Sequence, residues 1–104
     1  MIIKLYQHLA YQKNERVLAT QILKSGTSIG ANVEEALGGA SKRDFVAKLT
    51  ISQKETRETL YWLRLLKDSN IIVKNDLIND AEEILKILSS IIITSRKNLK
   101  KTNS

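Results

Sequence analysis

The sequence contains no proline, and its four glycines all lie between Gly26 and Gly39. Proline and glycine are the residues that most strongly interrupt helices, so the rest of the chain is free to form long ones. The chain has 104 residues, of which 42% are hydrophobic, and this length suffices for one core but not for two. We therefore predict one all-α domain over residues 1–104.

Apolar residues that recur every three to four positions predict four helices, over residues 2–12, 15–37, 41–67 and 75–97. Ser41 is the predicted N-cap of the third helix, with Asp44 in its first turn, where a carboxylate suits the positive helix end. Gly38 and Gly39 are expected to end the second helix by adopting the left-handed conformation. Residues 98–104 are polar and basic, and we expect them to fray.

Residues 24–39 are rich enough in glycine to suggest a phosphate-binding loop. Such a loop needs a preceding strand and a final Gly-Lys-Ser/Thr, and this segment has neither. Its apolar residues also stay in helical phase with those before it, so we place the glycines inside a helix that packs closely on the small, polar middle of the third helix. The predicted helix-packing seam consists of Gly26, Ser28, Gly30, Asn32, Ser52 and Thr56.

The third and fourth helices carry more apolar residues than one small bundle can bury. The third has apolar residues about 180° from its core stripe when each residue turns by 100°. The expected core stripe of the fourth is Leu77, Ala81, Ile84, Leu88 and Ile91. A flanking row at heptad spacing is Ile78, Leu85, Ile92 and Leu99.

Clustered surface apolar residues more often mark an interface than scattered ones do, so we predict a homo-oligomer. The predicted oligomer interface consists of Ile51, Glu58, Trp62, Leu65, Leu85, Ile92 and Ile93. Glu58 would lie among apolar side chains, where a carboxylate needs either a cationic partner or solvent at the rim.

Side chains that common enzymes use are missing. His8 is the only histidine, and there is no cysteine. The Glu-x-x-His pairs of helical di-metal sites are therefore absent, and the serines lack a histidine–acid pair to activate them. We predict no catalytic residue, no metal site, no cofactor and no enzymatic activity. The lack of cysteine suits the reducing cytoplasm, and no apolar stretch approaches the roughly 20 residues of a membrane span.

The formal net charge of +6 favours polyanionic partners such as nucleic acid. Basic residues occur on every helix and cluster only near the C-terminus. The predicted phosphate contacts are Lys42, Arg43, Arg96, Lys97, Lys100 and Lys101. The alternative is that the terminal cluster only compensates the negative helix end and aids solubility, since no recognition motif with interleaved aromatic residues accompanies the charge.

Three motifs carry a resemblance to a known family. They are Ser-Ile-Gly-Ala-Asn-Val-x-Glu-Ala at 28–36, Ser-x-x-Asp-Phe at 41–45, and Ile-Ser-x-Lys-Glu-x-x-Glu-Thr-x-Tyr-Trp-Leu at 51–63. They resemble the bacterial four-helix-bundle family called 23S ribosomal RNA intervening-sequence proteins, most strongly over residues 15–66. The resemblance implies an up-and-down four-helix bundle that forms a ring-like homopentamer without established enzyme activity.

A related branch of this family serves as the accessory protein of diversity-generating retroelements, where a basic pentameric barrel engages nucleic acid and the reverse transcriptase. Two features depart from the family pattern. Many relatives have proline at the position of Gly30. The first helix is shorter than usual, so either the bundle is incomplete at that end or the start codon lies upstream.

Together these features favour a non-enzymatic, homo-oligomeric bundle that binds nucleic acid, with structured RNA preferred, through distributed lysine and arginine contacts. The alternative is a structural or adaptor oligomer that binds a protein partner, such as a reverse transcriptase, and uses its charge for solubility.

Overall fold

The computed structural model describes residues 2–12, 16–69 and 75–103, without the side chains of residues 11, 12 and 101–103. Helix α1 (Ile2–Gln7) continues into a π-helical segment, η1 (His8–Gln12). It is followed by α2 (Arg16–Leu37), α3 (Lys42–Asp68) and α4 (Asn75–Asn103). The Cα atoms span 54 × 22 × 16 Å, so the molecule is an elongated rod.

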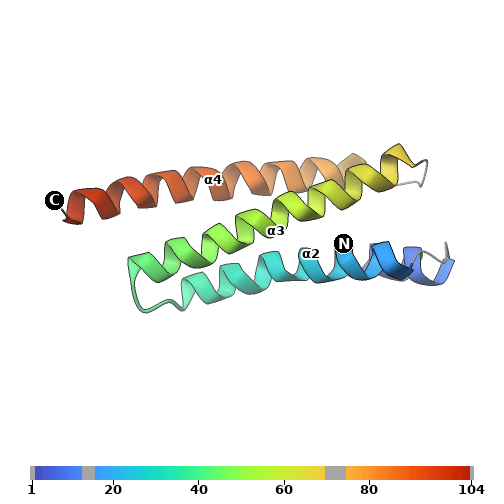
Figure 1. The fold of residues 1–104 in the computed structure, drawn as a ribbon, viewed down its shortest axis with the longest axis horizontal. Coiled ribbons are helices and arrows are strands. Elements are labelled where there is room, and N and C mark those ends of the chain that lie inside the picture. Colours follow the sequence, from blue (N-terminus) through green and yellow to red (C-terminus); the bar gives the residue numbers. More distant parts are fainter. Residues whose placement is uncertain (1, 13–15, 70–74, 104) are drawn as a thin grey trace.

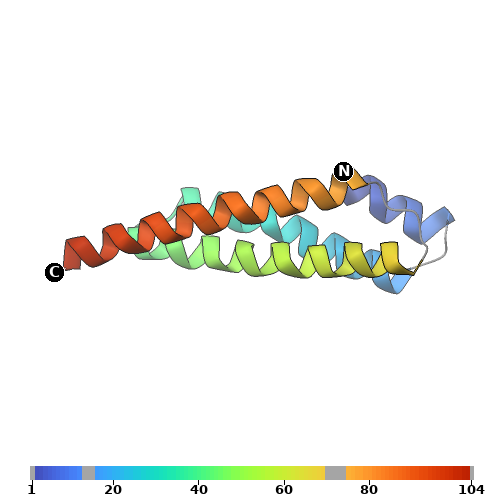
Figure 2. The ribbon, with the colours of Figure 1, turned by 90° about the horizontal axis from the view of Figure 1, so that it is seen from above.

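The long helices run up and down side by side, with α3 between α2 and α4 (Figure 1). The short α1 packs on α2 near the start of that helix, at one end of the rod (Figure 2). Within the described residues, the bundle therefore has four helices at one end and three at the other. The predicted all-α, up-and-down four-helix bundle with a short first helix is confirmed.

Two apolar clusters form the core. The cluster at the α1 end consists of Leu5, Leu9, Ala10, Ala19, Ile22, Leu60, Leu63, Leu66, Ile78 and Ala81. The cluster at the other end consists of Ala36, Val46, Leu49, Leu88 and Ile92. Burying one such large side chain contributes about 1.5–3 kcal/mol, and the two clusters thus hold both ends of α3 against its neighbours.

A band of small polar residues joins α2 to α3. Ser52 Oγ donates a hydrogen bond to the Ile29 carbonyl at 2.8 Å, and Thr59 Oγ1 donates to Ser25 Oγ at 2.9 Å. Thr56 Oγ1 donates to the Ser52 carbonyl on its own helix at 2.8 Å. Every buried side-chain nitrogen and oxygen in the described part of the chain has a partner. Small hydroxyl side chains can thus be buried here without the cost of unmade hydrogen bonds.

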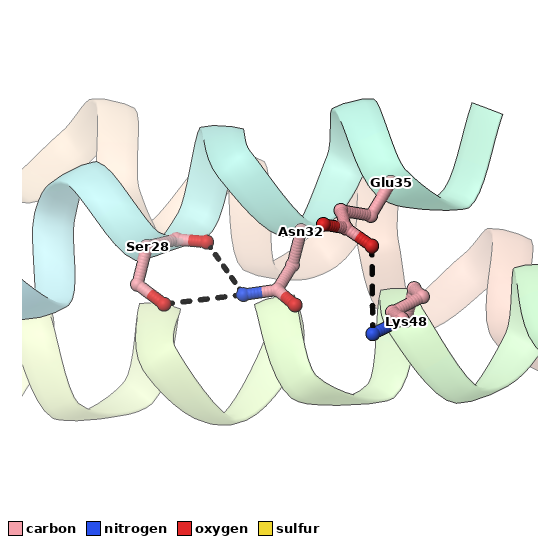
Figure 3. Close-up of polar contacts among 4 residues, drawn as sticks. All are labelled: Ser28, Asn32, Glu35 and Lys48. Carbon is pink, nitrogen blue, oxygen red and sulfur yellow. Dashed lines mark hydrogen bonds and ion pairs between the residues drawn. The ribbon is translucent and has the colours of Figure 1, made fainter. Parts of the chain in front are cut away.

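The two glycines of α2 have different surroundings from those expected. Both lie inside the helix, but a Cβ atom at Gly26 would lie 2.9 Å from the side chain of Ile2 on α1, while one at Gly30 would meet nothing within 4 Å. Gly30 therefore makes no close helix contact, which corrects its assignment to the seam. Asn32 Nδ2 donates to the Ser28 carbonyl at 2.9 Å and to Ser28 Oγ at 3.1 Å, so this pair bonds within α2 (Figure 3).

The core face of α4 also differs from the expected one. Ile78 and Ile92 are buried, whereas Ile84 and Ile91, which we had assigned to the core, are each 38% exposed. Gln53 Nε2 of α3 donates to Ser89 Oγ at 2.9 Å and so shows which side of α4 meets α3. The heptad row of Ile78 and Ile92 lies on that side, because α4 packs mainly against α3. Ile92 is thus a core residue, which corrects its assignment to the oligomer interface.

Some of the helix ends agree with those predicted from local sequence signals, and others do not. The Ser41 cap is confirmed, because its Oγ accepts a hydrogen bond from the Asp44 N–H at 3.1 Å. Helix α2 ends at Leu37 as predicted, but neither Gly38 nor Gly39 has a positive φ, so the expected left-handed cap was wrong. Helix α4 continues beyond its predicted end to Asn103. The predicted start of α2 at residue 15 lies outside the described residues.

Candidate nucleic-acid interface

The basic residues predicted from the sequence lie at one end of the molecule. Lys42 and Arg43 begin α3, and Arg96, Lys97 and Lys100 lie near the end of α4. Figure 1 shows the start of α3 and the end of α4 at the same end of the rod. The structure thus brings together two groups that are far apart in the sequence. The side chain of Lys101 lies outside the described residues.

A row of α3 residues connects this end to the middle of the molecule. Arg43, Thr50, Arg57 and Arg64 are spaced by seven positions, so they lie along one side of the helix. Arg96 Nη2 donates to Thr50 Oγ1 at 3.5 Å, and Arg64 Nη2 donates to Glu82 Oε1 at 3.1 Å. Both contacts join this row to α4, so the row follows the α3–α4 boundary.

Two adjoining hollows lie along that boundary and together form what we call the α3–α4 groove. Both are open to solvent, and their volumes are about 520 Å³ and about 430 Å³. Arg57, Leu85 and Lys86 line both hollows. The larger is also lined by Ser89, Ser90, Ile93 and Thr94. Cationic groups and hydroxyls that converge on one hollow can bind the oxygens of a phosphate.

The charge of the groove comes from two cations. In the described part of the chain, neither Arg57 nor Lys86 forms an ion pair, and both are exposed. Arg64 is paired with Glu82 at 3.1 Å. On the other side of α3, Lys48 Nζ lies 3.6 Å from Glu35 Oε2 of α2 (Figure 3). Glu82 also lines the smaller hollow, but it is the only carboxylate beside the three cations Arg57, Arg64 and Lys86 among the residues that line the two hollows, so the groove keeps a net positive charge.

The residues predicted for an oligomer interface are divided between several places. Ile51, Glu58, Trp62 and Leu65 lie on the outer side of α3, where Ile51 is exposed and the others are half-buried. Trp62 Nε1 donates to Glu58 Oε1 at 3.4 Å, which gives this carboxylate a partner in its own helix. Leu85 and Ile93 line the groove instead.

The predicted site residues do not include Tyr61, Arg57 or Lys86, although Arg57 and Lys86 belong to the basic residues distributed over the helices. Tyr61 is 58% exposed, and its ring lies edge-on to that of Trp62, with 5.0 Å between ring centroids. Lys54 and Arg57 precede Tyr61 by seven and four positions, and Arg64 follows it by three. This spacing places an aromatic residue among cations on one side of a helix, a signal present in the sequence.

Other classes of site receive no support from the geometry. No group of three or more histidine, aspartate or glutamate side chains within the described ranges is arranged to hold a metal ion. None of the helices, as far as the structure describes them, combines the length and apolarity needed to cross a bilayer.

Comparison with known proteins identifies the family. The model of the 23S rRNA-intervening sequence protein family matches residues 1–90. The chain belongs to this family. A similar solved structure is that of a protein with unknown function from the S23 ribosomal protein family of Bacteroides thetaiotaomicron. It shares 47% sequence identity and a TM-score of 0.84, over 88% of this chain and 84% of the other. The comparison with curated proteins gives no match.

The range of the family match distinguishes the basic groove from the basic residues near the end of α4. The match to the intervening-sequence family includes the groove cations Arg57 and Lys86. It ends before Arg96, Lys97 and Lys100. The groove cations Arg57 and Lys86 therefore belong to the part of the chain that matches the family, and Arg96, Lys97 and Lys100 lie beyond it.

Proposed function

We propose that this protein is a non-enzymatic, homo-oligomeric bundle of the cytoplasm that binds nucleic acid, with structured RNA as the preferred ligand. The observation that supports binding is the α3–α4 groove, where Arg57 and Lys86 stand beside three hydroxyl residues and form no ion pair with another described residue. The family's name refers to 23S rRNA, which favours RNA over DNA as the ligand.

Phosphate contact is the mode of binding that suits these residues. Lysine and arginine that neutralise phosphates release counterions, and this release supplies most of the sequence-independent affinity. The row that includes Arg43 and Arg57 would extend such contacts from the groove toward Lys97 and Lys100 at the end of the molecule. Contacts of this kind fix position and do not read bases.

RNA affinity should fall linearly with salt on a log–log plot, with a slope of about 0.7–0.9 per neutralised phosphate. Conversion of Arg96, Lys97, Lys100 and Lys101 to Ser should flatten the slope, since each change removes a cation. Fluorescence anisotropy with a labelled hairpin RNA measures both slopes. Undetectable binding of the native protein at about 50 mM salt would contradict the proposal and favour the adaptor alternative.

Self-association is the second part of the proposal. It is supported by Ile51 on the outer side of α3, which is exposed beside the half-buried Trp62 and Leu65. Apolar side chains that adjoin on one surface are typical of subunit interfaces. The family resemblance implies a pentamer, in which each basic groove would be repeated around the ring.

Light scattering of the native protein at micromolar concentration should give the mass of an oligomer. Trp62→Glu should shift the mass toward the monomer, because it places a second carboxylate beside Glu58 in the predicted interface. Val17→Glu is a matched control, since Val17 is 77% exposed and lies on α2. A monomeric native protein, or equal effects of both changes, would contradict the interface on α3.

One observation favours the adaptor alternative. Ile84, Ile87 and Ile91 are exposed on α4, and their spacing of three and four positions places them on one side of the helix. An apolar stripe of this kind suits the groove of a partner protein or its amphipathic helix.

A further inference from the structure

Tyr61 is an exposed aromatic residue whose ring is held in place. More than half of its surface is exposed, yet its ring packs edge-on against Trp62, with an angle of 71° between the ring planes. Trp62 in turn packs against the buried cluster at the α1 end and donates a hydrogen bond to Glu58. The tyrosine ring thus presents surface to solvent while a partly buried neighbour restrains it, which lowers the entropy lost when a ligand stacks on it.

Tyr61 also lies beside the α3–α4 groove. Arg57 lines both hollows of the groove, and Tyr61 follows it by four positions on the same helix. Side chains with this spacing are neighbours, with about 5–6 Å between their Cβ atoms. This is within the span of one nucleotide, from its phosphate to its base. A chain whose phosphate is bound by Arg57 and Lys86 can therefore place a base on Tyr61.

Charge at this position favours an anionic ligand. Lys54 is exposed on the same side of α3, two turns before Tyr61. Of the nearby carboxylates, Glu82 pairs with Arg64, whereas Glu58 accepts a hydrogen bond from the neutral Trp62 side chain and keeps its charge, so the cations Lys54, Arg57 and Lys86 still outnumber it. Arg57 and Lys86 have no such partner in the described part of the chain.

We propose that Tyr61 is a stacking platform for an unpaired base of single-stranded RNA, whose adjacent phosphate is bound in the groove by Arg57 and Lys86. Stacking on an aromatic side chain is worth about 1–3 kcal/mol per base and needs a base face that a duplex does not expose. This inference rests on the proposed RNA-binding function. It adds that the preferred segments are loops or single strands, and that one residue outside the basic cluster recognises them.

The test compares Tyr61→Ala and Tyr61→Phe in the full chain. The probes are a labelled 12-nucleotide single-stranded RNA and a blunt duplex RNA of the same length, measured by anisotropy at several salt concentrations. Tyr61→Ala should weaken single-strand binding roughly 5- to 100-fold and leave both duplex affinity and the salt slope unchanged. Tyr61→Phe, which keeps the ring, should retain affinity within about twofold of the native protein.

Arg57→Gln gives the complementary result. It should lower the salt slope by about 0.7, because it removes one phosphate contact from a single strand. Circular dichroism checks that each variant remains folded, which we expect because both side chains are exposed.

Two outcomes separate this inference from the function on which it rests. If the native protein binds RNA and Tyr61→Ala binds the single strand equally well, the stacking position is refuted while the proposed function stands. If the native protein binds neither probe, the proposed function itself fails. A Tyr61→Ala variant that loses oligomer mass in light scattering and binds both probes more weakly would also overturn the inference, because Tyr61 would then belong to a subunit interface.

Discussion

Replacement of Ile92 with Asp should strongly destabilise the protein. Ile92 is 1% exposed and lies in a cluster with Val46, Leu49 and Leu88. The change removes a large apolar side chain from this cluster and buries a carboxylate without a partner, two effects that together cost about 4–5 kcal/mol or more. Domains of this size are stable by about 5–15 kcal/mol, so thermal denaturation followed by circular dichroism should show a large loss.

The neighbouring residue provides the control. Ile93 is 55% exposed and lines the groove, so Ile93→Asp should leave the protein folded. A folded but monomeric Ile92→Asp variant would mean that Ile92 belongs to an interface between subunits, as its sequence pattern first suggested, and would refute its place in the core.

Removal of the two groove cations should have the largest effect on RNA binding. The double variant Arg57→Gln and Lys86→Gln should lower the salt slope by about 1.4 and weaken single-strand binding about 10- to 100-fold near 50 mM salt. Both side chains are exposed, so the stability of the bundle should change little. Anisotropy with the same 12-nucleotide RNA measures affinity and slope together.

A second double variant separates location from net charge. The double variant Arg16→Gln and Lys24→Gln lowers the net charge of +6 by two, as the groove variant does. Both residues lie on α2, which is on the other side of α3 from the groove. This variant should bind RNA nearly as well as the native protein. Equal weakening by both double variants would mean that affinity follows net charge alone and that the groove is not the binding site.

The recognised motifs contain side chains whose hydrogen bonds and ion pairs the structure specifies. In the first, Asn32 bonds to Ser28 within α2, and Glu35 pairs with Lys48 across to α3. In the third, Ser52 bonds to the Ile29 carbonyl of α2, and Glu58 accepts from Trp62. The contacts of Glu35 and Ser52 thus join α2 to α3, whereas those of Asn32 and Glu58 stay within one helix. The basic groove lies on the opposite boundary of α3.

The sequence alone determined the helices and their approximate limits. These depend on interactions between residues close in the chain. The lack of proline, the apolar period and the Ser41 cap act within one or two turns. Local signals were weaker where a helix end has no side-chain cap. For that reason the end of α4 and the conformation of Gly38 and Gly39 were misjudged.

The tertiary structure alone decided which face of each helix is covered. On α4 two apolar rows compete, and no local interaction distinguishes them. Packing against α3 buries Ile78 and Ile92, while Ile84 and Ile91 stay exposed. The groove likewise depends on the pairing of α3 with α4, which brings Arg57 beside Lys86. Contacts between residues this far apart in sequence follow from packing of whole helices, which periodicity within a single helix does not specify.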